Sequence, residues 1–476
     1  MADAPNILLF VIDSQRTSNL TVHGYGRHTT PHMESLAPEG MVFENHISTS
    51  PWCLGSYASL HTGKYPSSHG ANIHFECLTT EFPTLAEILG RHEYQTVGLS
   101  CNSYISEAVE LDRGFEQFEF FKATKGEDED KGAAEMERRA CKWLDSADRE
   151  RPFFMFVNCN EPHWPYWAPE PYRFLFLPEH DKDKEYIEQL PGRSQTRPDM
   201  NDDPLTPDDW KLVKGLYDGE TAHADGALGA VIDALRSREL LDNTLVIATS
   251  DHGEDQGEHM GFLTHAYHLY RTVLHIPLVI RLPGKVPAGK RYSGLTQPVD
   301  LFPTILTLAG LDDKEWHEGL QGTSLCPAFE GGQIREHAIA EYSSPLQKLE
   351  RDLRFNKIPS RFVRKLHRYL KSIEDGQYKF IWSSDGNDQL FDLHADPMEE
   401  NNIIEEQLEK AEELYKKLDE WLMEQPHRDY GDALNVHPIK DVKPENLKRL
   451  EAWGLLRRIH ELPFGSGEHL SDTLGD

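Results

Sequence analysis

Three apolar, β-rich runs of the sequence end in polar side chains that could bind a cation or transfer a proton. The runs are "NILLFVID" (6–13), "PFFMFVNCNEPH" (152–163) and "TLVIATSDHGE" (244–254), and their polar residues include Asp13, His163, Asp251 and His252. Carboxylate oxygens suit hard divalent cations, and an adjacent imidazole is compatible with calcium, manganese or zinc. Taken singly, an aspartate after a strand is more often a helix cap or a turn residue. The compact "SDHGE" favours the metal-binding interpretation.

Cys53 lies in "STSPWCLGSYASLHTGKYPSSHG" (48–70), a run of small and polar residues without a helix or strand period. A thiolate is both a nucleophile and a soft metal ligand. The six cysteines form no close pairs and no CxxC, so the sequence predicts neither a disulfide framework nor a structural zinc site. Most are expected to be plain buried thiols. Cys53 is the exception, because the small and polar residues around it are not typical of a core thiol.

Helical patterns lie between the strand-like runs, at 84–94, 133–147 and 219–240. Strands that alternate with helices predict an α/β fold, with a mainly parallel sheet between two layers of helices. In such sheets ligands bind at the carboxyl ends of the strands, so the four polar residues named above are expected in one cleft. The length of 476 residues predicts a large α/β domain and a smaller one, since single cores stop growing at roughly 250–300 residues.

The composition is that of an ordinary soluble protein with an acidic surface. The formal net charge is −31, with 38% hydrophobic and 27% charged residues. This charge repels nucleic-acid phosphates and anionic membranes, so no nucleic-acid partner is expected. Solubility is the simplest explanation of the charge, although a salty habitat would also fit. A small anionic substrate would have to be attracted by local cations or by a metal.

The first residues, "MADAPNILLFVIDSQR", contain no basic leader followed by an apolar core and a cleavage site. No window of the sequence approaches the length of about eighteen apolar residues that a membrane span needs. The sequence therefore predicts a cytoplasmic protein without a membrane span.

Eight landmarks in order resemble the sulfatase family of the alkaline phosphatase superfamily. They are "VIDSQRTSNLTVHGYGRHTTPHMESLAPEGMVFENH", "ASLHTGKYPSSHG", "FPTLAEIL", "LDRGFEQFE", "NEPHWPY", "SDHGEDQGEHMGFLTHAYHLY", "HIPLVIRLPG" and "VDLFPTIL". The resemblance implies an alkaline-phosphatase-like fold: a large mixed, mostly parallel sheet sandwiched by helices, and a smaller C-terminal α+β subdomain with a short antiparallel sheet. It also implies the hydrolysis of sulfate esters.

The resemblance aligns Cys53 with the family's nucleophile. In many relatives this cysteine, within C-x-P-x-R, is oxidised to formylglycine, whose hydrate supplies the attacking oxygen. Here Gly55 replaces the proline and Tyr57 the arginine, while "WCLGSYASL" is similar to a second pattern, W-T-L-P-S-H-A-S-L, with threonine as nucleophile. Two forms of the nucleophile stay open: the formylglycine hydrate and an unmodified thiolate, whose product would need a separate attack by water.

Other site residues follow from the same alignment. The resemblance implies one divalent cation, with Ca2+ favoured and Mn2+, Zn2+ or Mg2+ possible, at metal positions Asp13, Cys53, Asp251 and His252. It implies catalytic positions at His163, His265, Lys64 and His69, with His268 as a competitor of His265, and weaker substrate contacts at Arg16 and Ser14. The chain also departs from the family, because Ser14 replaces a second aspartate and "VGLSCNS" replaces the usual "GKWH" segment.

Three regions are predicted: a catalytic domain (1–345), a C-terminal subdomain (346–425) and an extension (426–476). The subdomain begins with a basic helical segment, continues as two strands around "SDGN", and ends in an amphipathic helix at 405–425. The leucines of that helix, which we expect to pack on the domain, are Leu408, Leu414, Leu418 and Leu422. The extension could wrap the core or contact another subunit in a homo-oligomer.

The sequence thus predicts a metal-dependent hydrolase of small sulfate monoesters that works by in-line attack of residue 53. A divalent cation would neutralise the ester oxygens, and His265 or His163 would protonate the leaving alkoxide. A phosphodiesterase, a phosphonate monoester hydrolase or a phosphotransferase on the same scaffold is the nearest alternative, because sulfuryl and phosphoryl centres share shape and in-line geometry. A non-catalytic, metal-stabilised binding protein is a third possibility.

Overall fold

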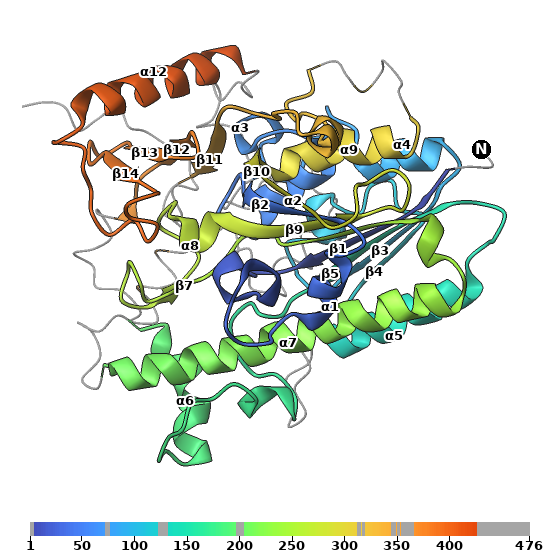
Figure 1. The fold of residues 1–476 in the computed structure, drawn as a ribbon, viewed down its shortest axis with the longest axis horizontal. Helices are drawn as coiled ribbons and strands as arrows, with labels where there is room; N and C mark the ends of the chain where they lie inside the picture. Colours follow the sequence, from blue (N-terminus) through green and yellow to red (C-terminus); the bar gives the residue numbers. More distant parts are fainter. Residues whose placement is uncertain are drawn as a thin grey trace, which may run out of the picture.

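The computed structural model shows a large sheet between two layers of helices, with a smaller unit beside it (Figure 1). The residues that it describes are 4–71, 77–121, 132–196, 204–311, 316, 319–343, 349, 353 and 366–425. The predicted fold class, with its large mostly parallel sheet and its small antiparallel one, is confirmed.

Eight strands form the main sheet in the order β10-β2-β9-β6-β1-β5-β3-β4. Their bounds are β1 Asn6–Ile12, β2 Met41–Ile47, β3 Gln95–Ser100, β4 Gln117–Phe120, β5 Phe153–Cys159, β6 Thr244–Thr249, β9 His275–Arg281 and β10 Lys290–Thr296. Strand β1 is parallel to both of its neighbours, β5 and β6, and β9 is antiparallel to β2 and β6. All residues of β1, β5 and β6 are buried, which explains their continuous apolar sequences.

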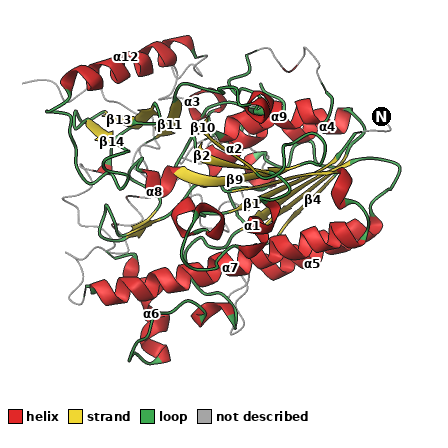
Figure 2. Cartoon of the chain, viewed as in Figure 1, coloured by secondary structure: helices red, strands yellow, loops and turns green. Residues whose placement is uncertain are grey.

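The two faces of the sheet belong to two apolar cores, because successive side chains of a strand point to opposite faces. On β1, Ile7, Leu9 and Val11 pack on one face, and Leu8, Phe10 and Ile12 pack on the other. The helices of the first face are α2 (Cys53–Thr62), α4 (Leu85–Arg91) and α9 (Leu301–Leu308). Those of the second face are α1 (Pro31–Leu36), α5 (Ala133–Ser146) and α7 (Pro207–Ser237). Figure 2 shows both layers, with α2 directly against the sheet.

The long helix α7 begins earlier than the pattern at 219–240 predicts. Its start is fixed by a capping box, in which the Thr206 side chain accepts from the Asp209 N–H and the Asp209 carboxylate accepts from the Thr206 N–H. Pro207 occupies the first helical position, where its missing N–H costs no hydrogen bond. The first part of the helix, residues 207–218, was not predicted.

The smaller unit is a four-stranded antiparallel sheet covered by one helix. Its strands are β11 (Ala338–Tyr342), β12 (Leu370–Glu374), β13 (Tyr378–Ser383) and β14 (Gln389–Asp392), and its helix is α12 (Leu408–Glu424). The two predicted strands are β13 and β14, and β11 lies before residue 346, where the subdomain was predicted to begin.

Helix α12 packs on this sheet through part of its predicted leucine stripe. Leu414 and Leu418 are buried in its core, and Leu422 packs against them. Leu408 is the exception: it is the first residue of the helix and is 66% exposed. The extension at 426–476 and most of the basic segment lie outside the described residues. Among the helices that are described, none has the length and apolar character to cross a bilayer.

Candidate active site

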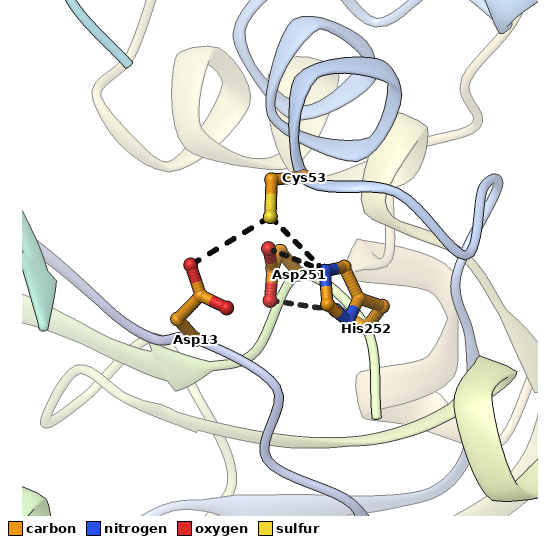
Figure 3. A group of neighbouring side chains, drawn as sticks. All are labelled: Asp13, Cys53, Asp251 and His252. Atoms are coloured by element: carbon orange, nitrogen blue, oxygen red, sulfur yellow. Dashed lines mark hydrogen bonds and ion pairs between the residues drawn. The ribbon is translucent and has the colours of Figure 1, made fainter. Parts of the chain in front are cut away.

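Four buried side chains from three separate parts of the chain meet at one edge of the main sheet (Figure 3). Asp13 directly follows β1, Asp251 and His252 follow β6, and Cys53 is the first residue of α2. One ligand atom of each residue lies within 4.8 Å of the others. The two aspartates come together because β1 and β6 are parallel neighbours whose carboxyl ends share this edge. These are the four residues that the sequence predicts as metal ligands.

The start of α2 is held close to the end of β6. Ser56 Oγ donates to the Asp251 carbonyl at 2.7 Å, so the first turn of the helix is fixed relative to the carboxylate. Gly55 permits the loop before α2 to pack closely on this first turn: a Cβ at that position would lie 2.8 Å from Ser50 Oγ. The N-terminal end of a helix also favours negative charge, and it therefore supports an anionic Cys53.

The thiol of Cys53 faces a lone pair of His252. Cys53 Sγ lies 3.2 Å from His252 Nε2 and 3.9 Å from Asp13 Oδ2. His252 Nδ1 is 2.9 Å from the Gly253 carbonyl, which can only accept, so Nδ1 carries the proton and Nε2 is unprotonated in the neutral ring. A histidine fixed in this way is oriented as a metal ligand.

Ser14 orients both carboxylates. Its backbone N–H donates to Asp251 Oδ1 at 3.0 Å, and its hydroxyl donates to Asp13 Oδ1 at 3.0 Å. To do so Ser14 adopts φ 58°, a conformation that non-glycine residues rarely take and that often marks functional sites. The His252 N–H also donates to Asp251 Oδ1, at 2.7 Å, while no described N–H or O–H group donates to Asp251 Oδ2. Asp251 Oδ2 lies 3.3 Å from His252 Nε2, so the two atoms can bind one cation.

The raised pKa values of the acidic groups indicate that a bound cation would stabilise this cluster. Burial, and then the charge of Asp251, raise the pKa of Asp13 to about 6. Burial raises the pKa of Asp251 to about 7, and burial together with both aspartates raises the pKa of the Cys53 thiol well above its ordinary value. Three groups that ionise as anions in one water-poor volume repel one another, and a divalent cation would relieve both that repulsion and the desolvation cost.

Two further histidines stand beside the cluster. The His265 ring lies 4.5 Å from that of His252 and 5.0 Å from that of His163. His265 Nδ1 is 3.1 Å from Glu254 Oε1, a carboxylate with 1% exposure. The hairpin of β7 (Asp255–Gln256) and β8 (Leu263–Thr264) brings this pair together. His268, the predicted competitor, is buried with Nε2 3.1 Å from a carboxylate oxygen of Asp255 instead.

Arg16 is not available to a substrate, contrary to the prediction. Its guanidinium forms a buried ion pair with Glu258 at 3.0 Å and donates to the Glu254 carbonyl at 3.0 Å. Through these contacts Arg16 stabilises the conformation of the loop after β6. Ser14, the other predicted substrate contact, orients the aspartates as described above.

Lys64 and His69 are also corrected, since the structure does not bring them to the cluster. Lys64 follows the C-terminal end of α2, roughly 15 Å along the ten-residue helix from Cys53, and its ammonium donates to the Gly319 carbonyl. Both ring nitrogens of His69 are engaged, one 3.1 Å from Ser59 Oγ and the other accepting from the Ala71 N–H at 3.1 Å.

Asn102 and Glu254 belong to the site although they were not predicted. Asn102 Nδ2 donates to Asp13 Oδ2 at 2.6 Å, and Glu254 holds His265. The signal for Asn102 was present, because it lies two residues beyond β3, at the same sheet edge as Asp13. Glu254 stands inside "SDHGE", but its partner could be identified only from the hairpin that folds back on it.

Fold and site together define a hydrolase of the alkaline phosphatase superfamily. The Sulfatase family model matches residues 5–311, and the model for the N-sulphoglucosamine sulphohydrolase C-terminal region matches residues 257–428. The first of these covers more than half of the chain. The protein therefore belongs to the sulfatase family and is a sulfuric ester hydrolase.

Relatives from several organisms match most of this chain. The chain is 25% identical to arylsulfatase K of Xenopus laevis over 433 residues, covering 83% of this chain and 78% of that protein. It is 25% identical to an arylsulfatase of Clostridium perfringens over 509 residues, covering 92% and 99%. A choline-sulfatase of Rhizobium meliloti is 25% identical over 453 residues, covering 84% and 82%.

Solved structures share the fold. A protein in complex with its substrate D-glucosamine-2-N,6-O-disulfate has a TM-score of 0.71 at 20% identity, covering 92% of this chain and all of that one. The phosphonate monoester hydrolase of Agrobacterium radiobacter has a TM-score of 0.69 at 24% identity, covering 87% and 94%. Because these identities are below 25%, the similarity shows a shared fold only.

Proposed function

We propose that the protein hydrolyses small sulfate monoesters by in-line attack of residue 53, with a divalent cation held by Asp13, Asp251, His252 and residue 53. The observation that carries this proposal is the convergence of the four side chains within 4.8 Å. No other described group of three or more such residues has this arrangement.

The donor set fits a divalent cation. Metal–ligand bonds of about 2.0–2.6 Å separate neighbouring ligands by roughly 3–4.5 Å, which is close to the spread of the four atoms here. Two carboxylates and one imidazole suit Ca2+, Mn2+, Zn2+ or Mg2+, and we favour Ca2+ because carboxylate oxygens are hard donors. When bound, such an ion neutralises the ester oxygens and lowers the pKa of the nucleophile.

The chain's own residues supply the remaining functions. The start of α2 presents residue 53 and favours its anionic form. His265 is suited to protonate the leaving alkoxide, because the Glu254 carboxylate lies 3.1 Å from Nδ1 and orients the ring beside His252. Trp52, whose ring centroid is 5.2 Å from that of His265 and 5.5 Å from that of Tyr104, offers an apolar wall for the alcohol part of the ester.

Residue 53 can act in either of two chemical forms. Formylglycine, if the cysteine is converted, supplies a hydrate oxygen as the nucleophile. Gly55 is the smallest replacement for the family's proline, and the crowding against Ser50 explains why a larger residue does not stand there. An unmodified thiolate would use the same position and the same neighbours.

A phosphonate monoester hydrolase is the second candidate. The observation that favours it is the shared fold with the enzyme from Agrobacterium radiobacter, together with the similar tetrahedral geometry of the two reacting centres.

Turnover of an aryl sulfate and of a matched aryl phosphonate monoester separates the candidates. Cys53→Ala and Cys53→Ser should each lower turnover of the preferred substrate by orders of magnitude, and elemental analysis should find one divalent cation per chain. Peptide mass mapping across residue 53 of the protein from its native host distinguishes formylglycine from cysteine. Full activity of the Cys53→Ala variant would refute the proposal.

A further inference from the structure

The four cluster side chains come from three separate segments, so their relative positions depend on bonds that join those segments (Figure 3). Asp13 lies after β1, Asp251 and His252 lie after β6, and Cys53 begins α2. The ligands of a bound ion must lie within about 0.2 Å of their ideal distances. Bonds between the three segments therefore decide how well the cluster fits an ion.

Ser48 joins the loop that leads into α2 to the segment after β6. It directly follows β2 and is fully buried. Its hydroxyl donates at 2.5 Å to the Asp251 carbonyl, the nearer of two acceptors, since the Ser50 carbonyl lies 2.8 Å away. Ser56 Oγ donates to the same Asp251 oxygen at 2.7 Å, and a carbonyl oxygen can accept both bonds. Asp251 is thus held from the loop by Ser48 and from the helix by Ser56.

Ser250 joins the segment after β6 to the segment after β1. It directly follows β6, and its side chain is fully buried. The Ser250 hydroxyl donates to the His252 carbonyl at 2.8 Å and accepts from the Gln15 N–H at 3.0 Å. One hydroxyl can do both, because it has one hydrogen and two lone pairs. Gln15 stands two residues after Asp13, so this bridge limits how far Asp13 and His252 can move apart.

We propose that Ser48 and Ser250 are positioning residues for the metal site. Ser48 fixes Asp251 relative to the start of α2, and Ser250 fixes His252 relative to the segment that carries Asp13. This inference rests on the proposed function, in which the cluster binds a divalent cation. Both hydroxyls bond to backbone atoms, so each acts through the main chain of a ligand residue and not on the ion. Loss of a bridge would let ligands on different segments separate, and cation affinity would fall.

The test compares serine variants with matched controls in the full-length chain. The serine variants are Ser48→Ala, Ser250→Ala and the pair Ser48→Ala with Ser56→Ala. If an alanine variant at position 48 or 250 does not fold, the cysteine variant, whose thiol donates only weakly, replaces it.

Each control loses a buried hydroxyl that also bridges two segments, but neither segment carries a cluster residue. Thr96 Oγ1 donates to the Gly114 carbonyl at 2.7 Å and accepts from the Glu116 N–H at 2.8 Å. Thr304 Oγ1 donates to the Asp300 carbonyl at 2.5 Å and accepts from the Leu325 N–H at 2.8 Å. The control variants are Thr96→Val and Thr304→Val.

Isothermal titration calorimetry of the chelator-treated chain measures the Kd of the cation. Ca2+, Mn2+, Zn2+ and Mg2+ are titrated alone, and the ion that the wild type binds most tightly is used for every variant. Ser250→Ala should raise the Kd about 10–100-fold, the usual effect of losing a partner behind a metal ligand. Ser48→Ala should raise it less, because Ser56 still donates to the Asp251 carbonyl, and the Ser48/Ser56 pair should reach the full range.

The melting temperature without metal and the turnover of an aryl sulfate complete the comparison. The controls should lose as much melting temperature as the serine variants and keep the wild-type Kd. Turnover by the serine variants should fall at a low cation concentration and largely return when the concentration is raised, which a general loss of stability would not produce.

The outcomes separate this inference from the proposed function. If the wild type binds an ion and the serine variants keep its Kd, the positioning role is refuted and the metal site stands. If the controls lose as much affinity as the serine variants, the bridges are only structural and the inference is overturned. If the wild type binds none of the four ions, the proposed metal site fails, and this inference fails with it.

Discussion

His61 should make the protein sensitive to acid, because its imidazole is buried without a hydrogen-bond partner among the described residues. It lies on α2, the helix that presents Cys53, and is 1% exposed. Its ring packs against Phe156 at 4.7 Å and Phe115 at 6.1 Å, and neither ring nitrogen has a hydrogen-bond partner among the described residues. Burial lowers the pKa of His61 to about 3, from an ordinary 6.5.

The sign and size of the effect follow from linkage. The unfolded chain binds a proton on this histidine below pH 6.5, while the folded protein does not until about pH 3. As the pH decreases through that window, the free energy of unfolding therefore falls by about 1.4 kcal/mol per pH unit. At pH 4.5 the accumulated loss is about 2.7 kcal/mol. His61→Phe removes this loss. At neutral pH it should still stabilise the protein by about 1–3 kcal/mol, the cost of unpaired buried polar atoms.

Urea unfolding of the wild type and of His61→Phe, at pH 7.5 and pH 4.5, measures both the loss of stability in acid and the gain in stability at neutral pH. We expect the difference in free energy of unfolding between the two proteins to widen by about 2.7 kcal/mol at the lower pH. His28→Phe is the control, because His28 is exposed and should change neither value. The same difference at both pH values would refute the reasoning.

Three further predictions concern the site. Gly55→Ala should lower both the melting temperature and kcat, since its Cβ would lie 2.8 Å from Ser50 Oγ beside residue 53; an unchanged kcat would contradict the account of this turn. Lys64→Met should keep wild-type kcat/KM for an aryl sulfate, because the ammonium contacts the Gly319 carbonyl and not the cluster; a large loss would restore Lys64 to the mechanism. A chelator should lower the melting temperature of the wild type but much less that of Asp251→Asn, as differential scanning fluorimetry would show; equal shifts would place the cation elsewhere.

Much of the fold could be predicted because its signals are local. The strands β1, β5 and β6 are buried on both faces, and so they appear in the sequence as continuous apolar runs. The start of α7 was missed although its capping box is a local signal too. The leucine spacing of α12 did not distinguish the exposed Leu408 from the buried Leu414 and Leu418.

The sequence by itself determined that Asp13, Asp251 and His252 would lie at one sheet edge, since the carboxyl ends of parallel strands share an edge whatever the loops do. Only the tertiary structure decided what each other polar side chain touches. Helix α2 carries Lys64 away from Cys53, and the ion pair with Glu258 removes Arg16 from the site. Such contacts join residues far apart in the chain, and a hydrogen bond or ion pair depends on distances of a few ångströms that no local pattern encodes.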